Sequence, residues 1–489
     1  MKSHTLCSAI RCVLAGSVIV GLTACGGGGS GSSVDGSTAG ADGSSSGTSV
    51  GPITGFGSVY VNGKHFDSNS TTFEGDGITS QNQLKKGMIV SVRGDWDASG
   101  EGKADRIYYD DSLRGPVNSA ASNWDAAARS GKLSIVGQTV LLDSRTVFNG
   151  AAPADLVSAT ASTWVRVSGW RLADGSLRAM YVGVMSNHQN NPLHNQVEVE
   201  GVIANLDDSA KTFTINGFLI NYDIAQLEDI TGNVLTNGLK VEVEGTLNAS
   251  GDVLRASEVD GEQTLVDEND DVELSGAVTE DFDSLSGRFS LNGYIIQVSA
   301  STEFDDIRAK DLTSGVMVEV EGVLRNGVIN AEEIEGQSTD AAVSGLIESF
   351  DGSEFLVIGG VRVQLTNRTL IEYDSADDQV NDRIVWRTED LEALVVGRYV
   401  EVEGRQLEGD ETGLTALSVE IDDNEDDKSR YELEGRVEAT SANTVTVLGL
   451  ELLATALQLG QLTVGTEVEV EYVQNGGGQY QLLKLELDD

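Results

Sequence analysis

Acidic side chains at alternating positions dominate the chemistry that this sequence could offer. The pentapeptide Val-Glu-Val-Glu-Gly recurs at residues 197–201, 241–245, 318–322 and 400–404, and Val-Glu-Val-Glu-Tyr follows at 468–472. Alternation with valine is typical of a strand that buries one face and turns the other to solvent. Other copies of the strand carry Ser91, Arg93, Arg166 and Ser168 at these outward places. We interpret the glutamates as a solvated strand face, because a carboxylate needed for shared chemistry would not be replaced by arginine.

Catalytic groups other than carboxylates are scarce. Beyond an N-terminal leader described below, the histidines are His65, His188 and His194, and neither a His-Glu-x-x-His nor a Gly-x-Ser-x-Gly motif occurs. Two carboxylates held at a fixed separation in a cleft could hydrolyse a glycosidic bond. We expect a non-enzymatic protein, and a carbohydrate-active hydrolase with carboxylates in a cleft between domains is the alternative.

Two acidic runs offer oxygen ligands of the kind that Ca²⁺ prefers. They lie at 267–271 and 422–427, and neither has the glycine and terminal glutamate spacing of an EF-hand loop. We expect solvated linkers there. The alternative is weak calcium binding that stiffens the joints of an adhesin-like stalk, and no other cofactor is expected. The candidate ligands are Asp267, Asp270, Asp271, Asp422, Asp423, Asp426 and Asp427.

Aromatic and cationic side chains gather in one part of the chain. Four of the five tryptophans lie between residues 96 and 170, among most of the arginines of that half. Exposed aromatic rings beside arginine can stack on sugar rings or on bases. The alternation of Arg166 with Val165 and Val167 predicts that it points outward, and Trp170 is expected to be exposed. We expect a ligand face or, alternatively, packing between domains, formed by Trp124, Trp164, Arg166, Trp170 and Arg171.

The net charge of −46 is confined to one part of the chain. Residues 51–195 hold 13 basic and 13 acidic side chains, whereas residues 196–489 hold 17 and 63. Nucleic acid and anionic lipid are poor partners for such a surface, because like charges repel. We expect no nucleic-acid binding, and an envelope glycan or a protein is the expected kind of partner.

A repeat of about 75 residues organises the elements that would position these side chains. The last residues of six Val-x-Val-x-Gly-like strands are spaced by 75, 76, 77, 82 and 68 residues. Each copy has a first strand, a hairpin with an Asn-Gly-like turn, a short connector and two further strands. Five strands with a short helix or turn after the third is the order of an OB-type barrel. We predict an all-β protein of six tandem small OB-like five-stranded barrels, at 51–111, 112–186, 196–262, 271–336, 341–422 (with an insertion) and 430–489.

Several of these stretches resemble a known family. The segments GPITGFGSVYVNGKHFDS, LRGPV and GQTVLLDSRTVF, together with the Val-Glu-Val-Glu-Gly strands, are similar to uncharacterised tandem repeats of bacterial secreted proteins and lipoproteins. That family is known only as a domain of unknown function. The resemblance implies a small β-barrel fold, and it implies no catalytic residue.

The first fifty residues predict export. Lys2 and Arg11 flank a short apolar run, and Leu22-Thr23-Ala24-Cys25 resembles a lipobox. We expect a lipoprotein signal peptide at 1–24, a lipid on Cys25 that anchors the chain to a membrane, and a flexible Gly/Ser tether at 25–50. Gly26 is not the aspartate associated with retention in the inner membrane, which favours the outer membrane. The prediction is a lipid-anchored cell-envelope protein that acts as a non-enzymatic binding or structural module.

Overall fold

The computed structural model describes residues 45–126, 129–159, 163–185, 196–261, 266–373, 384–407, 411–422, 430–460 and 462–487. The predicted signal peptide, Cys25 and residues 26–44 lie outside these ranges, as do the candidate calcium ligands Asp423, Asp426 and Asp427. Within the described ranges, every helix is too short or too polar to cross a membrane.

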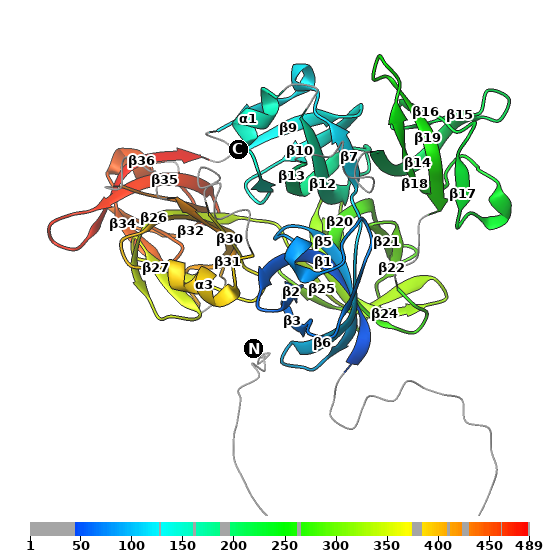
Figure 1. Ribbon diagram of the computed structural model, residues 1–489. Helices are drawn as coiled ribbons and strands as arrows, with labels where there is room; N and C mark the ends of the chain where they lie inside the picture. Colours follow the sequence, from blue (N-terminus) through cyan, green and yellow to red (C-terminus); the bar gives the residue numbers. More distant parts are fainter. Residues whose placement is uncertain are drawn as a thin grey trace, which may run out of the picture. The chain divides into compact units, whose positions relative to one another are not determined.

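The six barrels are called repeats 1 to 6 in chain order. Repeat 3, predicted at residues 196–262, shows the architecture of one barrel. Its five main strands are β14 (Val197–Asp207), β15 (Thr212–Ile215), β16 (Phe218–Asn221), β18 (Lys240–Leu247) and β19 (Val253–Gly261). They pair in the order β15-β16-β19-β18-β14, and β14 pairs β15 to close the barrel. Only the pairing of the third strand with the fifth is parallel. This order is that of an OB barrel, so the predicted fold is confirmed (Figure 1).

Short elements bridge the third and fourth strands. In repeat 3 these are β17 (Gln226–Glu228), which pairs β19, and the single-turn helix η4 (Thr231–Asn233). Repeat 1 comprises β1 (Ser45–Phe56), β2 (Val59–Val61), β3 (Lys64–Asp67), β4 (Thr72–Glu74), η1 (Gln81–Gln83), β5 (Ile89–Trp96) and β6 (Glu101–Tyr109). Repeat 4 comprises β20 (Asp271–Asp283), β21 (Arg288–Leu291), β22 (Tyr294–Gln297), β23 (Glu303–Asp305), η5 (Ala309–Asp311), β24 (Met317–Arg325) and β25 (Val328–Gly336).

Repeats 5 and 6 follow the same order. Repeat 5 comprises β26 (Ala341–Phe350), β27 (Phe355–Ile358), β28 (Val361–Gln364), β29 (Leu370–Tyr373), α3 (Arg387–Ala393), β30 (Tyr399–Gln406) and β31 (Leu414–Asp422). Repeat 6 comprises β32 (Tyr431–Thr440), β33 (Thr444–Val447), β34 (Leu450–Leu453), α4 (Ala456–Leu459), β35 (Glu467–Gln474) and β36 (Tyr480–Leu487).

Repeat 2 is the irregular copy. Its elements are β7 (Leu113–Pro116), η2 (Ser119–Ala121), β8 (Asn123–Asp125), β9 (Ser130–Ile135), β10 (Gln138–Leu142), β11 (Val147–Asn149), α1 (Pro153–Val157), β12 (Trp164–Arg171) and β13 (Leu177–Val184). The first strand is interrupted by η2: an isolated bridge between Val117 and Ile135 lies next to β7, and β8 pairs with β9 beyond the interruption.

The six predicted hairpin turns are all present. Both central residues have positive φ in each of them, for example 48° at Asn216 and 83° at Gly217. These values fit the type I′ turn, whose twist matches that of the flanking strands. The valines of the alternating strands lie in the barrel cores, as the sequence predicts, and Val241 and Val243 are fully buried.

The barrels pair through their first strands, and one of the three pairs joins repeats that are not consecutive in the chain. Strand β7 of repeat 2 runs antiparallel to β14 of repeat 3, and β26 of repeat 5 runs antiparallel to β32 of repeat 6. Strand β1 of repeat 1 runs parallel to β20 of repeat 4. In the part of the chain that the structure describes, the result is three sheets of 12, 13 and 11 strands, each made by two barrels.

The start of β1 differs from the prediction of a tether to residue 50. Residues Ser45–Pro52 pair with β5, and Gly47–Val50 also pair with β20. Small side chains permit this close approach, since a Cβ on Gly47 would lie 2.0 Å from the Asp271 carbonyl oxygen. Ser49 is buried and donates a hydrogen bond to Glu273 Oε2 at 3.0 Å. Residues 45–50 therefore belong to the first barrel.

Candidate functional site

The predicted tryptophan and arginine face is not an exposed face. Trp170 is only 6% exposed and packs against Met180, Ala277 and Met317, where repeats 2 and 4 meet. Trp124 is half-buried against Phe148, with ring centroids 6.0 Å apart. The expectation that Trp170 is exposed is wrong, because the contact with repeat 4 covers it.

The remaining side chains of that predicted face also make contacts within the protein. Trp164 is half-buried and packs on the core of repeats 2 and 3. Arg166 binds Asp111, and Arg171 donates a hydrogen bond to the Glu200 carbonyl oxygen at 2.6 Å. Of the two readings that the sequence left open, packing between barrels is the one that fits these contacts.

The acidic run at 267–271 is partly neutralised by repeat 1. The guanidinium of Arg93 pairs with Asp267 and lies 3.6 Å from Asp270 Oδ2. Asp271 is the first residue of β20, and Asp422 is the last of β31. A guanidinium already supplies the positive charge that a calcium ion would bring to Asp267 and Asp270.

Several glutamates of the alternating strands are buried, which corrects the prediction of a solvated face. Glu198, Glu273 and Glu319 are all at most 3% exposed. They point away from their own barrel core, as the alternation requires, but another repeat covers that outer face. Ionised carboxylates are costly to bury unless a cation or a hydrogen bond compensates them.

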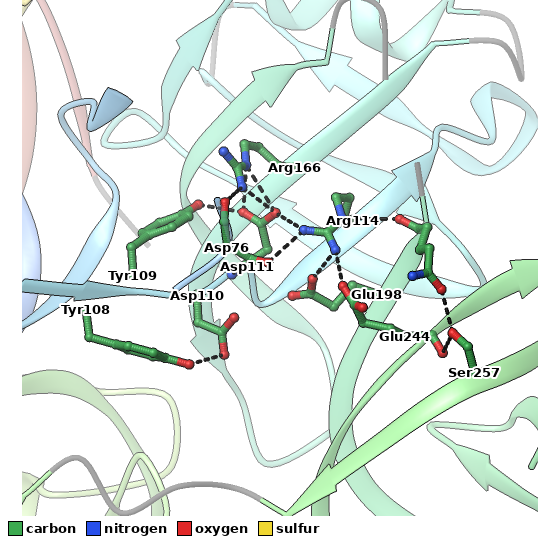
Figure 2. Close-up of polar contacts among 11 residues, drawn as sticks. Asp76, Tyr108, Tyr109, Asp110, Asp111, Arg114, Arg166, Glu198, Glu244 and Ser257 are labelled. Carbon is green, nitrogen blue, oxygen red and sulfur yellow. Dashed lines mark hydrogen bonds and ion pairs between the residues drawn. The ribbon is translucent and has the colours of Figure 1, made fainter. Parts of the chain in front are cut away.

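A dense group of buried charges lies where repeats 1, 2 and 3 meet (Figure 2). We call it the acidic junction. Repeat 1 and the segment after it contribute three aspartates, repeat 2 two arginines and repeat 3 three glutamates. The members are Asp76, Asp110, Asp111, Arg114, Arg166, Glu198, Glu242 and Glu244. Six carboxylates thus face two guanidinium groups.

Arg114 is the central cation of the acidic junction. Strand pairing places it opposite Glu198, and its side chain is fully buried. Its Nη2 lies 2.6 Å from Glu198 Oε2 and 2.5 Å from Glu244 Oε1. Its Nη1 lies 3.0 Å from both Asp76 Oδ1 and Asp111 Oδ2. One guanidinium therefore joins carboxylates of repeat 3 to carboxylates of repeat 1 and the segment that follows it.

Arg166 and Tyr109 fix Asp111. Arg166 donates through Nε to Asp111 Oδ1 at 2.8 Å and through Nη2 to Oδ2 at 2.9 Å. The Tyr109 hydroxyl donates to Asp111 Oδ1 at 2.7 Å. Burial alone would raise the pKa of Asp111, but the guanidinium groups of Arg166 and Arg114 hold that pKa below its ordinary value. Asp111 is thus an ionised, fully compensated carboxylate.

Asp110 and Glu242 are not compensated in this way. Within the described ranges neither pairs with a lysine or an arginine, and the Tyr108 hydroxyl reaches Asp110 Oδ2 at a long 3.4 Å. Burial, followed by the charge of Glu242, raises the pKa of Asp110 well above its ordinary value. Burial is also the main reason that the pKa of Glu242 rises to about 7. One oxygen each from Asp110, Glu198 and Glu242 lie within 4.8 Å of one another.

Repeat 4 carries glutamates at the three equivalent positions, but their cation partners differ. Glu273, Glu319 and Glu321 correspond to Glu198, Glu242 and Glu244, because both barrels pair their first and fourth strands in the same register. Lys64 of repeat 1 bridges Glu273 and Glu321 at 3.0 and 3.2 Å. Arg368 of repeat 5 lies 2.5 Å from Glu319 Oε1. Each of the three glutamates in repeat 4 therefore has a cation.

A small cavity lies between repeats 1, 2 and 5. It has a volume of about 30 Å³ and is lined by residues that include Lys86 and Glu372. Lys86 Nζ lies 2.9 Å from Asp390 Oδ1, whereas Glu372 Oε1 has no hydrogen-bond partner. A space of this size admits a water molecule rather than a sugar ring.

Sequence reasoning identified Arg166 but missed the rest of the acidic junction. The useful signal was present, since repeats 1 and 2 carry arginine at outward strand positions where later repeats carry glutamate. That exchange suggests that the two kinds of repeat pair with each other. The interpretation of the glutamates as a solvated strand face overlooks this pairing.

Comparisons with known proteins agree with the repeat period. A family model described as "Domain of unknown function (DUF5666)" matches residues 48–108, 114–183, 200–260, 275–335, 344–420 and 434–482. No curated protein matches the chain.

Two solved structures are similar in part. A single-stranded DNA binding protein from Thermus aquaticus is 15% identical, with 31% of this chain and 94% of that chain covered and a TM-score of 0.17. The Drosophila Unr CSD456 structure is 14% identical, with 46% and 97% covered and a TM-score of 0.13. These scores are too low to carry an argument, and the fold assignment rests on the strand order. Because the six matched segments span most of its length, the chain belongs to the DUF5666 family.

Proposed function

We propose that this protein is a lipid-anchored, non-enzymatic module of the cell envelope whose six barrels form a structural body. The observation that carries this proposal is that the recurring glutamates form ion pairs between barrels. In repeats 3, 4 and 5 they pair with cations from other repeats, through Arg114, Lys64, Arg368 and Arg129. The chemistry that the repeats share therefore joins barrels, whereas a hydrolase would direct paired carboxylates into a cleft.

The anchor is part of the same proposal. The supporting feature is the sequence Leu22-Thr23-Ala24-Cys25, followed by a segment rich in glycine and serine. A lipid on Cys25 would hold the structural body at a membrane, and Gly26 favours the outer membrane. The proposed partners of the body are an envelope glycan or a protein.

Metabolic labelling with a radioactive fatty acid tests the anchor. The full chain should take up label and sediment with outer-membrane fragments on a density gradient. A Cys25→Ser variant should lose the label, whereas the matched Cys12→Ser variant should keep it. Label that persists in Cys25→Ser, or sedimentation with the inner membrane, would contradict this part of the proposal.

Incubation of the purified full chain with envelope glycans tests the absence of enzymatic activity. We expect no release of reducing ends over the rate without protein. Release that disappears in a Glu372→Gln variant would favour the hydrolase, because Glu372 is a buried carboxylate with an unpartnered oxygen beside a cavity.

A further inference from the structure

Among the described residues, two carboxylates of the acidic junction face each other and not a lysine or an arginine, unlike the three glutamates of repeat 4. Glu242 corresponds to Glu319, which Arg368 neutralises, but Glu242 faces the carboxylate of Asp110 instead. The related barrel thus shows what this strand position requires when another repeat covers it.

Glu198 provides an independent observation at the same group of carboxylates. Its side chain is fully buried, its Oε2 pairs with Arg114 Nη2 at 2.6 Å, and its Oε1 has no hydrogen-bond partner. Buried carboxylate oxygens without any partner are rare, because such an oxygen loses its hydration without compensation. This oxygen belongs to the residue that forms a group of closely spaced ligand atoms with Asp110 and Glu242.

We propose that Asp110, Glu198 and Glu242 bind a divalent cation, with calcium as the ion that fits best. The ion would join the segment between repeats 1 and 2 to strands β14 and β18 of repeat 3. This site is independent of the proposed lipid anchor, since it lies wholly within the barrels.

The ligand chemistry selects the class of ion. Three carboxylates provide oxygen alone, which suits hard cations and excludes ions that prefer sulfur or nitrogen. Calcium accepts six to eight oxygens in flexible geometry, so water can complete its coordination, whereas magnesium demands a near-ideal octahedron. The ligands come from a linker and from two strands, which fits the flexible coordination of calcium better than the octahedron of magnesium.

Two neighbouring acidic groups are weaker candidates. Asp76, Glu198 and Glu244 also place oxygens within 4.8 Å of one another, but Arg114 already contacts all three. Glu228, Glu258 and Asp260 form a similar group at the edge of repeat 3, where Glu228 is exposed and Glu258 and Asp260 are half-buried. That edge group serves as the matched control.

Terbium luminescence tests the site directly. Terbium(III) prefers oxygen ligands and has nearly the radius of calcium, and a nearby excited tyrosine sensitises its emission. The Tyr108 hydroxyl lies 3.4 Å from Asp110 Oδ2, so an ion on Asp110 would be within range. For the full chain freed of metal with a chelator, we expect saturable emission that calcium displaces more readily than magnesium. Emission that does not saturate, or that calcium leaves unchanged, would overturn the proposal.

Matched variants separate this site from the edge group. Asp110→Asn combined with Glu242→Gln should abolish both the terbium emission and the heat of calcium binding in calorimetry. Glu258→Gln combined with Asp260→Asn should leave both unchanged.

Thermal melting shows whether the variant still folds. Without metal, the Asp110→Asn/Glu242→Gln chain should still melt cooperatively near the melting temperature of the parent, since neutral amides keep the shape of the carboxyl groups and leave no unpaired charge buried. Calcium should then raise the melting temperature of the parent alone. Emission retained in the Asp110→Asn/Glu242→Gln chain, or lost in the edge-group variant, would place the ion elsewhere and refute the assignment.

Discussion

Replacing Arg114 by methionine is the strongest single test of the joint between repeats 1, 2 and 3. Methionine keeps much of the side-chain volume and removes the charge. The guanidinium lies within 3.0 Å of four carboxylates, of Asp76, Asp111, Glu198 and Glu244, and it is fully buried. Removing one partner of a buried ion pair typically costs about 3–5 kcal/mol, because the other charge stays buried without compensation. We expect a loss in this range at neutral pH.

Urea unfolding followed by tryptophan fluorescence measures this loss. Trp124 and Trp164 lie in repeat 2, so their emission reports the barrel that carries Arg114. The control is Arg255→Met, whose partner Asp223 is 3.4 Å away and where the side chains are 57% and 44% exposed. An exposed pair contributes about 0–1 kcal/mol, so this control should unfold almost as the parent does.

A second substitution should reverse part of the effect. In an Arg114→Met/Glu198→Gln chain the buried negative charge of Glu198 is removed together with its cation. Such a chain should be more stable than Arg114→Met alone, because fewer buried carboxylates lack compensation. A loss below about 1 kcal/mol in Arg114→Met, on the scale of an exposed pair, would refute the role assigned to this residue.

Three further predictions concern other joints. Lys64→Met should destabilise the contact of repeats 1 and 4 by about 3 kcal/mol, since buried Glu273 loses its cation, whereas Lys310→Met at an exposed pair should change the urea midpoint little. Trp170→Ala should cost about 3–5 kcal/mol in urea unfolding, through the cavity that it leaves, and should not alter glycan binding. Burial raises the pKa of Glu372 to about 7 from an ordinary 4.5. Its neutral form therefore adds stability that is complete below about pH 4.5 and is lost as pH rises through 7, and in thermal melting Glu372→Gln should flatten this dependence.

The repeat and the barrel could be predicted from local features of the sequence. The period of about 75 residues, the six hairpin turns and the inward valines all follow from local rules. Positive φ at Asn216 and Gly217 is a property of two adjacent residues, and the burial of Val241 and Val243 is a property of one strand. Such features need no knowledge of distant parts of the chain, so they could be predicted.

Which barrels pair, and what the outward side chains contact, depends on parts of the chain that are distant in sequence. The partnership of β1 with β20 joins residues more than 200 positions apart, and together with the pairing of β1 and β5 it makes residues 45–50, a predicted tether, part of a sheet. The same kind of contact places Glu198 against Arg114 and leaves Glu242 facing Asp110. Alternation tells which way a side chain points, but solvent and a second barrel are equally compatible with an outward direction. The neighbour therefore decides whether a glutamate is hydrated, paired or left to bind an ion.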